Sequence, residues 1–366
     1  MRHDNPVYFS QDYGAWHVFR YADVQQVLQD HATFSSNMSS RMGPEASALL
    51  QSSIISLDPP RHRLLRSLVT KALTPKKVIE MATRIQMLTD QLLEAGRDTG
   101  RMDVIDDLAY PLPVIVIAEL LGVPAQDRER FKYWSDVIVG SEIHQDQMTD
   151  LRNEMAEYFL RVVEERRREP GNDLITALLA AEVDGERLSL RELLGFCVLL
   201  LVAGNETTTN LIGNAVYCFT QQPDTIPRLI ETPSLLPSAI EEVLRYRSPV
   251  QVLPHRFARV DTTIDGHKIL AGQQMLVWLG SANRDESVFR VADRFIIDRV
   301  PNPHIAFGAG IHFCLGANLA RLEARIALST LLSRCREIVV DEAGVEWIRG
   351  GIVHGLKRLP VQFQPG

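Results

Sequence analysis

A single cysteine, Cys314, stands out because it lies in a glycine-rich stretch directly before a helical pattern. Glycines at 308, 310 and 316 allow the backbone left-handed or crowded conformations that other residues resist. The pattern from Ala317 to Leu328 predicts a helix, whose N-terminal N–H groups would favour the thiolate of Cys314 over the thiol. One thiolate presented in this way suits the iron of a haem.

The other three cysteines do not suggest a competing metal site. Cys197 and Cys218 fall on one predicted long helix, where their separation corresponds to about 30 Å, far beyond the reach of a disulfide. Cys335 stands alone, and no Cys-x-x-Cys pair is present for zinc. We expect all three to be core thiols in a reducing cytosol.

The residues around Cys314 also carry a resemblance to a known family. The run from Phe307 to Gly316 follows the pattern Phe-Gly-x-Gly-x-His-x-Cys-x-Gly, and it resembles the haem-binding loop of the cytochrome P450 family. The resemblance extends from near Pro6 to the C-terminus. It implies haem b (iron protoporphyrin IX) as cofactor, with Cys314 as the metal ligand and with Phe307, His312 and Gly316 among the residues that bind the cofactor.

Length and composition predict one globular domain. The chain has 366 residues, of which 45% are hydrophobic and 23% charged, and no linker or internal repeat divides it. The formal net charge of -7 argues against a nucleic-acid partner. Neither an apolar signal core nor an apolar run long enough to span a bilayer is present, so we expect a cytoplasmic protein without a membrane anchor.

The order of the predicted elements indicates a mainly α protein with small β-sheets, as in the single-domain cytochrome P450 fold. Residues 1–60 read as a mixed α/β start, 61–248 as mostly helical, and 249–366 as β segments with the haem-binding loop and its helix. We expect strands at 7–9, 16–19, 256–259 and 275–278, and helices at 21–29, 78–93, 112–121, 155–167, 188–219 and 238–246.

A second chemical signal lies inside the longest predicted helix, at Gly204, Glu206 and Thr207. Three consecutive threonines from Thr207 are poor helix formers, so we expect the helix to be distorted there. The resemblance implies that Ala203 and Gly204 border the haem and the oxygen pocket. It also implies that Glu206 and Thr207 are catalytic, as the acid and the alcohol that deliver protons to dioxygen.

Several separated residues are implied by the resemblance to hold or support the haem. Cations and hydrogen-bond donors for its two propionates come from His62, Arg66, Arg256 and His312. Glu242 and Arg245 lie at i and i+3 on a predicted helix. With Arg299 they are expected to form a buried structural group that supports the site without performing chemistry.

The expected substrate pocket is aliphatic, which favours an apolar molecule such as a fatty acid, a terpenoid or an aromatic hydrocarbon. No flavin, nicotinamide or iron–sulfur motif is present, so the two electrons must come from a ferredoxin or flavodoxin with its reductase. Cations at 63, 71, 76, 321 and 325 are candidates to steer this acidic partner. The candidate pocket residues are Ile54, Ile55, Val202, Val250, Leu253, Ile352 and Val353.

The sequence therefore predicts a haem-thiolate monooxygenase that hydroxylates or epoxidises an apolar small molecule with dioxygen. A peroxygenase driven by hydrogen peroxide is the nearest alternative, although it has less need of both Glu206 and Thr207. A haem protein that binds or senses without turnover is the alternative from another class.

Overall fold

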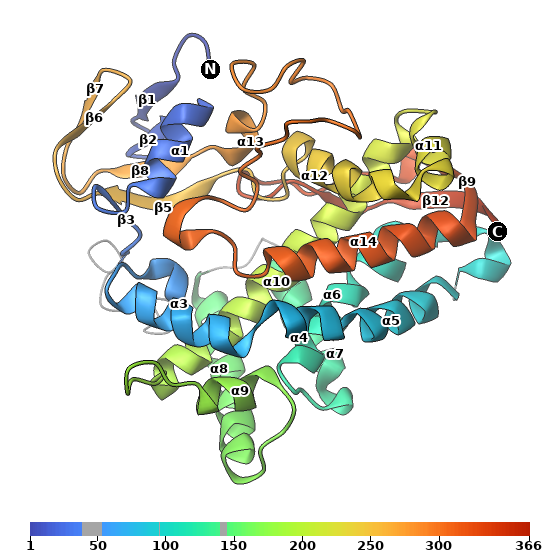
Figure 1. The fold of residues 1–366 in the computed structure, drawn as a ribbon, viewed down its shortest axis with the longest axis horizontal. Helices are drawn as coiled ribbons and strands as arrows, with labels where there is room; N and C mark the ends of the chain where they lie inside the picture. The colour runs from blue at the N-terminus through green and yellow to red at the C-terminus, as the bar shows by residue number, and fades with distance from the viewer. Residues whose placement is uncertain (39–52, 95, 140–144) are drawn as a thin grey trace. The chain divides into compact units, whose positions relative to one another are not determined.

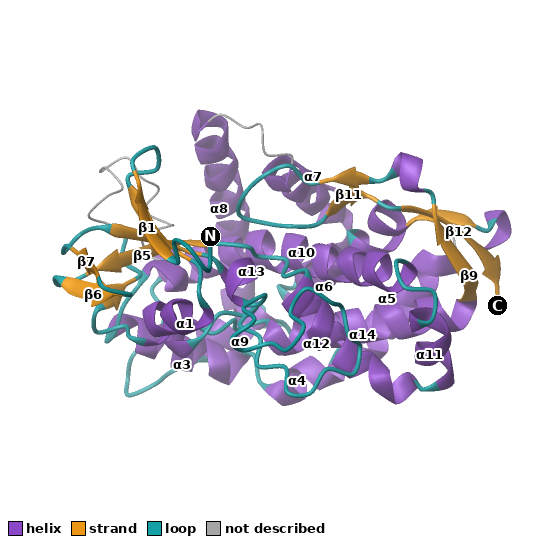
Figure 2. Cartoon of the chain, turned by 90° about the horizontal axis from the view of Figure 1, so that it is seen from above, coloured by secondary structure: helices purple, strands orange, loops and turns teal. Residues whose placement is uncertain are grey.

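The computed structural model describes residues 1–38, 53–94, 96–139 and 145–366 (Figure 1). Helices dominate and the strands form small sheets, which confirms the predicted fold class (Figure 2). The chain divides into two compact units, described separately below. The first comprises residues 1–35, 82–110 and 207–366, and the second comprises 36–81 and 111–206. The expectation of a single domain stays a prediction.

A five-stranded sheet forms one part of the first unit, in the order β1-β2-β8-β5-β3. β1 and β2 form an antiparallel hairpin, β2 pairs with β8 in parallel, and β5 pairs antiparallel with β8 and β3. The strands predicted near the N-terminus and those predicted at 256–259 and 275–278 thus meet in one sheet. The strands are β1 (Val7–Ser10), β2 (Ala15–Val18), β3 (Phe34–Ser35), β5 (Leu253–Ala258) and β8 (Gln274–Val277).

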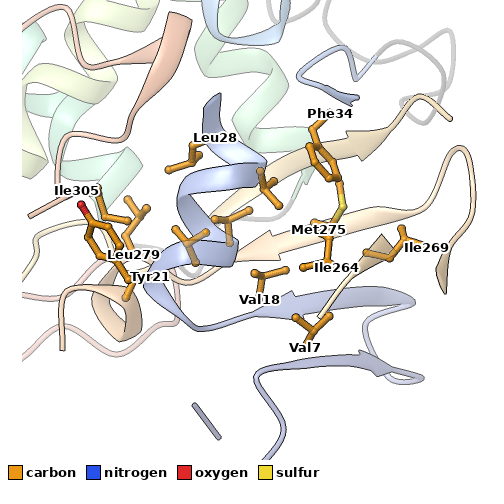
Figure 3. Close-up of a cluster of buried hydrophobic side chains, with 14 of the residues drawn as sticks. Val7, Val18, Tyr21, Leu28, Phe34, Ile264, Ile269, Met275, Leu279 and Ile305 are labelled. Carbon is orange, nitrogen blue, oxygen red and sulfur yellow. The ribbon is translucent and has the colours of Figure 1, made fainter. Parts of the chain in front are cut away.

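Helix α1 (Tyr21–Gln29) covers this sheet with its apolar face (Figure 3). Val24 and Leu28 are buried one helical turn apart, and they pack in a cluster with Val18 and Met275 of the strands. The cluster continues to Ile305, the first residue of the loop 305–316 that carries Cys314. The same core therefore anchors both the sheet and one end of the loop.

The remaining elements of the first unit are helices and small sheets. α14 runs beside α5, as Figure 1 shows, and it also packs against α11 and α12. The helices are α5 (Ala82–Glu94), α11 (Thr225–Glu231), α12 (Leu236–Tyr246), α13 (Leu279–Ala282), α14 (Ala317–Arg334) and the second part of α10 (Leu190–Thr220). The strands are β4 (Arg101–Asp103), β6 (Thr262–Ile264), β7 (His267–Ile269), β9 (Cys335–Val340), β10 (Glu346–Trp347), β11 (Leu356–Arg358) and β12 (Pro360–Pro365).

The second unit is mainly helical in its described residues, with one isolated bridge between Val183 and Glu186. α6 packs on α7, α8 packs on α9, and α3 also packs on α9. Its helices are α3 (Arg61–Ala72), α4 (Pro75–Glu80), α6 (Pro111–Leu120), α7 (Arg128–Val139), α8 (Gln145–Arg168), α9 (Leu174–Ala180) and the first part of α10.

Two local predictions were wrong. The helix expected at 78–93 is two helices, α4 and α5, because the N–H of Met81 bonds to the carbonyls of Val78 and Ile79 in a tight turn. The distortion expected at Thr207 is absent, because α10 runs as one α-helix from Leu190 to Thr220. Burial of Thr208 and Thr209 within the packed structure outweighs their low helix propensity.

Candidate active site

The cysteine loop, residues 305–316 of the first unit, presents an exposed Cys314 just before α14. The Cys314 N–H donates to the carbonyl of Phe307 at 2.9 Å, which closes the loop across its glycines. The N–H of Gly308 donates to the carbonyl of Ile305, also at 2.9 Å. Hydrogen bonds within the loop thus fix where the thiol-bearing residue lies.

The glycines of this loop play different parts. Gly308 and Gly310 have φ values of 72° and 69°, as expected for left-handed positions. A Cβ at Gly310 would lie 2.5 Å from the carbonyl oxygen of Leu28, so the loop passes close to α1. Gly316 differs from the expectation: its φ is -83°, it is the N-cap of α14, and a Cβ there would meet open space.

A buried ionic group in the first unit consists of Glu242, Arg245 and Arg299. The Arg245 guanidinium donates at 2.8 Å to both carboxylate oxygens of Glu242, and Arg299 Nε lies 3.0 Å from Glu242 Oε2. The remaining Arg245 donors bond to the carbonyls of Asn283, Ala292 and Arg294, so all of its N–H groups are used.

Asn283 connects this group to the cysteine loop, and sequence reasoning missed it. Its carbonyl accepts from Arg245, its Oδ1 accepts from the N–H of Ile305 at 2.8 Å, and its Nδ2 donates to Ser248 Oγ at 2.8 Å. An asparagine in a short turn gives no sequence signal of such a role. Burial of every one of these groups makes their hydrogen bonds costly to lose.

Two of the predicted propionate partners belong to the first unit. Arg256 is buried on β5, opposite Met275 of β8, and its NH1 donates to the carbonyl of His255 at 2.7 Å. His312 ends the short helix Gly310–His312, which lies against α1. Their roles stay predictions.

The predicted oxygen-side residues lie on α10. Along this mostly buried helix Ala203 is exposed and Thr207, one turn later, is half-buried, so the two positions share a face that is open. A Cβ at Gly204 would lie 3.0 Å from Ile117 Cδ1 of α6, so glycine allows the close approach of these helices. Burial raises the pKa of Glu206 above that of an ordinary carboxyl.

Helix α3 of the second unit carries the other two predicted propionate partners. His62 is buried and Arg66, one turn later, is half-buried. Next to them Arg61 forms a bidentate pair with Glu192, with Nε and NH2 each 2.6 Å from a carboxylate oxygen. At the other end of α3, Lys71 Nζ donates to the carbonyl of Glu182 at 2.8 Å. The segment that leads into α10 therefore holds both ends of α3.

The candidate pocket residues fall into two groups. Val250 and Val353 form an isolated antiparallel bridge in the first unit, supported by bonds from Gln251 N–H to the Ile352 carbonyl at 2.7 Å and from His354 N–H to the Pro249 carbonyl at 2.8 Å. This brings two separated predicted segments together, with Leu253 on the following strand. Ile54, Ile55 and Val202 belong to the second unit.

Three of the cations expected to steer an electron donor already have partners, one of them Lys76, whose Nζ lies 3.9 Å from Glu80 Oε1. Lys71 bonds to the Glu182 carbonyl, and Arg321 forms a bidentate pair with Glu241. The Nε and NH2 atoms of Arg321 are each 2.7 Å from a Glu241 oxygen. A docking partner would have to compete with these bonds.

The donor set fits a haem better than a metal held by protein alone. Among the described residues no group of three or more His, Cys, Asp or Glu side chains could hold an ion. An exposed lone cysteine in a glycine loop instead suits an iron whose other ligands come from a macrocycle. Cys197, Cys218 and Cys335 are buried thiols, as predicted. No helix in the described ranges is long and apolar enough to cross a membrane.

Comparisons with a family model, with known sequences and with solved structures all point to one family. A family model described as Cytochrome P450 matches residues 123–363. The chain is 45% identical over 374 residues to Cytochrome P450 109 of Bacillus spizizenii, covering 99% of this chain and 90% of that protein.

Solved structures agree with the sequence comparison. Substrate-free CYP109E1 from Bacillus megaterium superposes with a TM-score of 0.94 at 42% identity, covering 100% of this chain and 97% of that one. The complex of CYP109E1 with testosterone gives a TM-score of 0.91 at 43% identity, covering 99% and 97%.

Proposed function

The chain belongs to the cytochrome P450 family, and from this membership we propose which of its residues bind haem and which move protons. It is a haem-thiolate monooxygenase that acts on apolar small molecules with electrons from a redox partner. Cys314 is proposed as the thiolate ligand of haem b. Its exposure, and the bond that fixes its backbone to Phe307, support this assignment.

The proposal assigns proton delivery to Glu206 and Thr207. When bound, the haem supplies the activation of dioxygen by two externally supplied electrons. The observation that carries this proposal is that Ala203 and Thr207 remain accessible on α10. Most other positions of this helix are buried by packing, so an accessible face leaves room for a ligand. A Glu206 with a raised pKa keeps its proton to a higher pH than an ordinary carboxyl and can pass it to the Thr207 hydroxyl.

The same proposal gives the other predicted residues their roles. His62, Arg66, Arg256 and His312 hold the propionates, while Ala203, Gly204, Phe307 and Gly316 contact the cofactor. Glu242, Arg245 and Arg299 support the cysteine loop through Asn283. Burial of Arg256 and His62 supports this assignment, because a buried cation or donor gains most from an anionic partner.

The proposed substrate is an apolar molecule as large as a steroid. The candidate pocket residues are aliphatic, and a similar protein has been crystallised with testosterone. The proposed electron donor is a ferredoxin or flavodoxin, which fits the absence of a flavin or iron–sulfur motif from the sequence. The three buried thiols, Cys197, Cys218 and Cys335, form no disulfide, which supports a cytoplasmic location.

The test measures product formed per electron pair consumed, with testosterone as substrate and a ferredoxin system as donor. Thr207→Ala should lower this ratio roughly tenfold or more while oxygen is still consumed, because proton delivery fails. Thr220→Ala is the matched control, since its hydroxyl bonds to the Val216 carbonyl of the same helix away from the site. Full coupling in Thr207→Ala would remove the proposed relay, and turnover with peroxide alone would favour a peroxygenase.

A further inference from the structure

We propose that Arg321 and Glu241 are positioning residues for the cysteine loop. Glu241 precedes Glu242 on α12, but its side chain belongs to a different group. Arg321 lies in the second turn of α14 and meets Glu241 through two hydrogen bonds of 2.7 Å. This bidentate geometry fixes the plane of the guanidinium as well as its position.

The fixed guanidinium lies over the first residue of the pattern that carries Cys314. The Arg321 Cζ atom is 4.5 Å from the centroid of the Phe307 ring, within the range of a cation–π contact. The carbonyl of Phe307 in turn accepts the N–H of Cys314 at 2.9 Å. Arg321 is thus linked to the backbone of Cys314 through a single residue.

His304 braces the same group from the loop side. Its Nδ1 accepts the N–H of Ala306 at 3.3 Å, which leaves Nε2 to donate to Glu241 Oε2 at 2.9 Å. Burial alone would raise the pKa of Glu241, but the hydrogen bonds from Arg321 and His304 lower it to about 2. The carboxylate therefore stays charged and keeps both donors in place.

The contribution of this group is orientation more than global stability. The Arg321 and Glu241 side chains are 33% and 31% exposed, and pairs with such access to water add little to the free energy of unfolding. Lysine in place of arginine would keep the charge but lose the planar fork. The loop should then move more freely while the fold persists.

The test is amide hydrogen exchange of the holoprotein, followed in peptides that span residues 305–316. Arg321→Lys and Glu241→Gln should each speed exchange there about fivefold, the size expected for loss of one exposed pair and its ring contact. The reduction potential of the haem should shift in the same variants. Arg334→Lys is the matched control, because Arg334 lies on α14, pairs with Asp90 and is 39% exposed.

A double-variant cycle tests the route through Phe307. If Arg321 acts through this ring, Arg321→Lys should add little further exchange to the Phe307→Leu variant. Additive effects, or exchange in 305–316 equal to that of the control, would overturn the proposal. The inference rests on the proposed role of Cys314, but hydrogen exchange of the loop is measured independently of that role. If Cys314 were not the iron ligand, the absorption spectrum would lack the thiolate-type band, and the exchange pattern of residues 305–316 would stay as predicted.

Discussion

Arg245 in the first unit and Arg61 in the second make nearly the same bidentate bond to a glutamate, yet their surroundings differ. Arg245 bonds to Glu242 with both side chains 0% exposed. Arg61 bonds to Glu192 with its own side chain 37% exposed. The first pair supports the cysteine loop, and the second holds α3. The two pairs have similar geometry but differ in the free energy that their loss would cost, because water can screen and replace only the bond between Arg61 and Glu192.

This difference in burial separates the rigid surroundings of Arg245 from the more mobile surroundings of Arg61. Around Arg245 every N–H group is bonded, and four of the five hydrogen bonds are buried, so a change to one residue strands several others. Around Arg61 the contacts reach the rim of the unit, and Glu186 is an exposed additional partner at 3.4 Å. We infer that the position of the cysteine loop tolerates little variation, whereas α3 can open locally.

Removal of Glu242 should give the largest effect. Glu242→Ala leaves Arg245 and Arg299 buried without their carboxylate, which should cost about 3–5 kcal/mol of unfolding free energy and lower the yield of holoprotein. Urea unfolding measures this, with Glu186→Ala as a control for loss of an exposed carboxylate. A loss below about 1 kcal/mol would contradict the contrast between the two regions.

Replacement of Glu323 on α14 should give the next largest effect, and it should raise the unfolding free energy where loss of Glu242 lowers it. Its side chain is buried at 1% exposure, and its Oε2 has no hydrogen-bond partner in the described structure. Burial raises its pKa to about 8. The folded protein then holds a proton that the unfolded chain releases, so stability is highest below the ordinary pKa of about 4.5 and falls as the pH rises towards 8.

The neutral isostere Glu323→Gln removes this penalty. It should raise the unfolding free energy by about 4 kcal/mol at pH 8, and the gain should shrink as the pH falls towards 4.5. Urea unfolding at several pH values measures the difference. A gain of the same size at every pH would show that packing, and not ionisation, separates the two proteins.

Glu192 should give the smallest effect. Glu192→Gln weakens the pair with Arg61 and the hydrogen bonds from Ser189 at the start of α10, which together contribute about 1 kcal/mol. Hydrogen exchange should rise in residues 61–72 and stay unchanged in 305–316. If hydrogen exchange in the cysteine loop rose as much as in α3, the proposed contrast between the surroundings of Arg245 and Arg61 would be wrong.

The sequence predicted the secondary-structure elements well where the signal is local. Apolar periodicity predicted α1 and α10 closely, whereas the short strands β6 and β7 were not predicted. The break at Met81 was missed because that stretch keeps its apolar period across the turn.

Contacts between distant residues could not be predicted in the same way. Asn283, His304 and Glu241 act through partners 22 to 80 positions away, and nothing in their own neighbourhoods marks them. Arg321 is predicted from the sequence only as one of the cations that steer an electron donor. Its pairing with Glu241 depends on how α12 packs against α14, which only the fold decides.

The absorption spectrum of the reduced protein exposed to carbon monoxide tests the central claim, that Cys314 is the iron ligand. We expect a thiolate-type Soret band in the native protein and in the control Cys335→Ala, whose cysteine is a buried free thiol on β9. In Cys314→His that band should be absent. A thiolate-type band retained by Cys314→His, or one missing from the native holoprotein, would contradict the account.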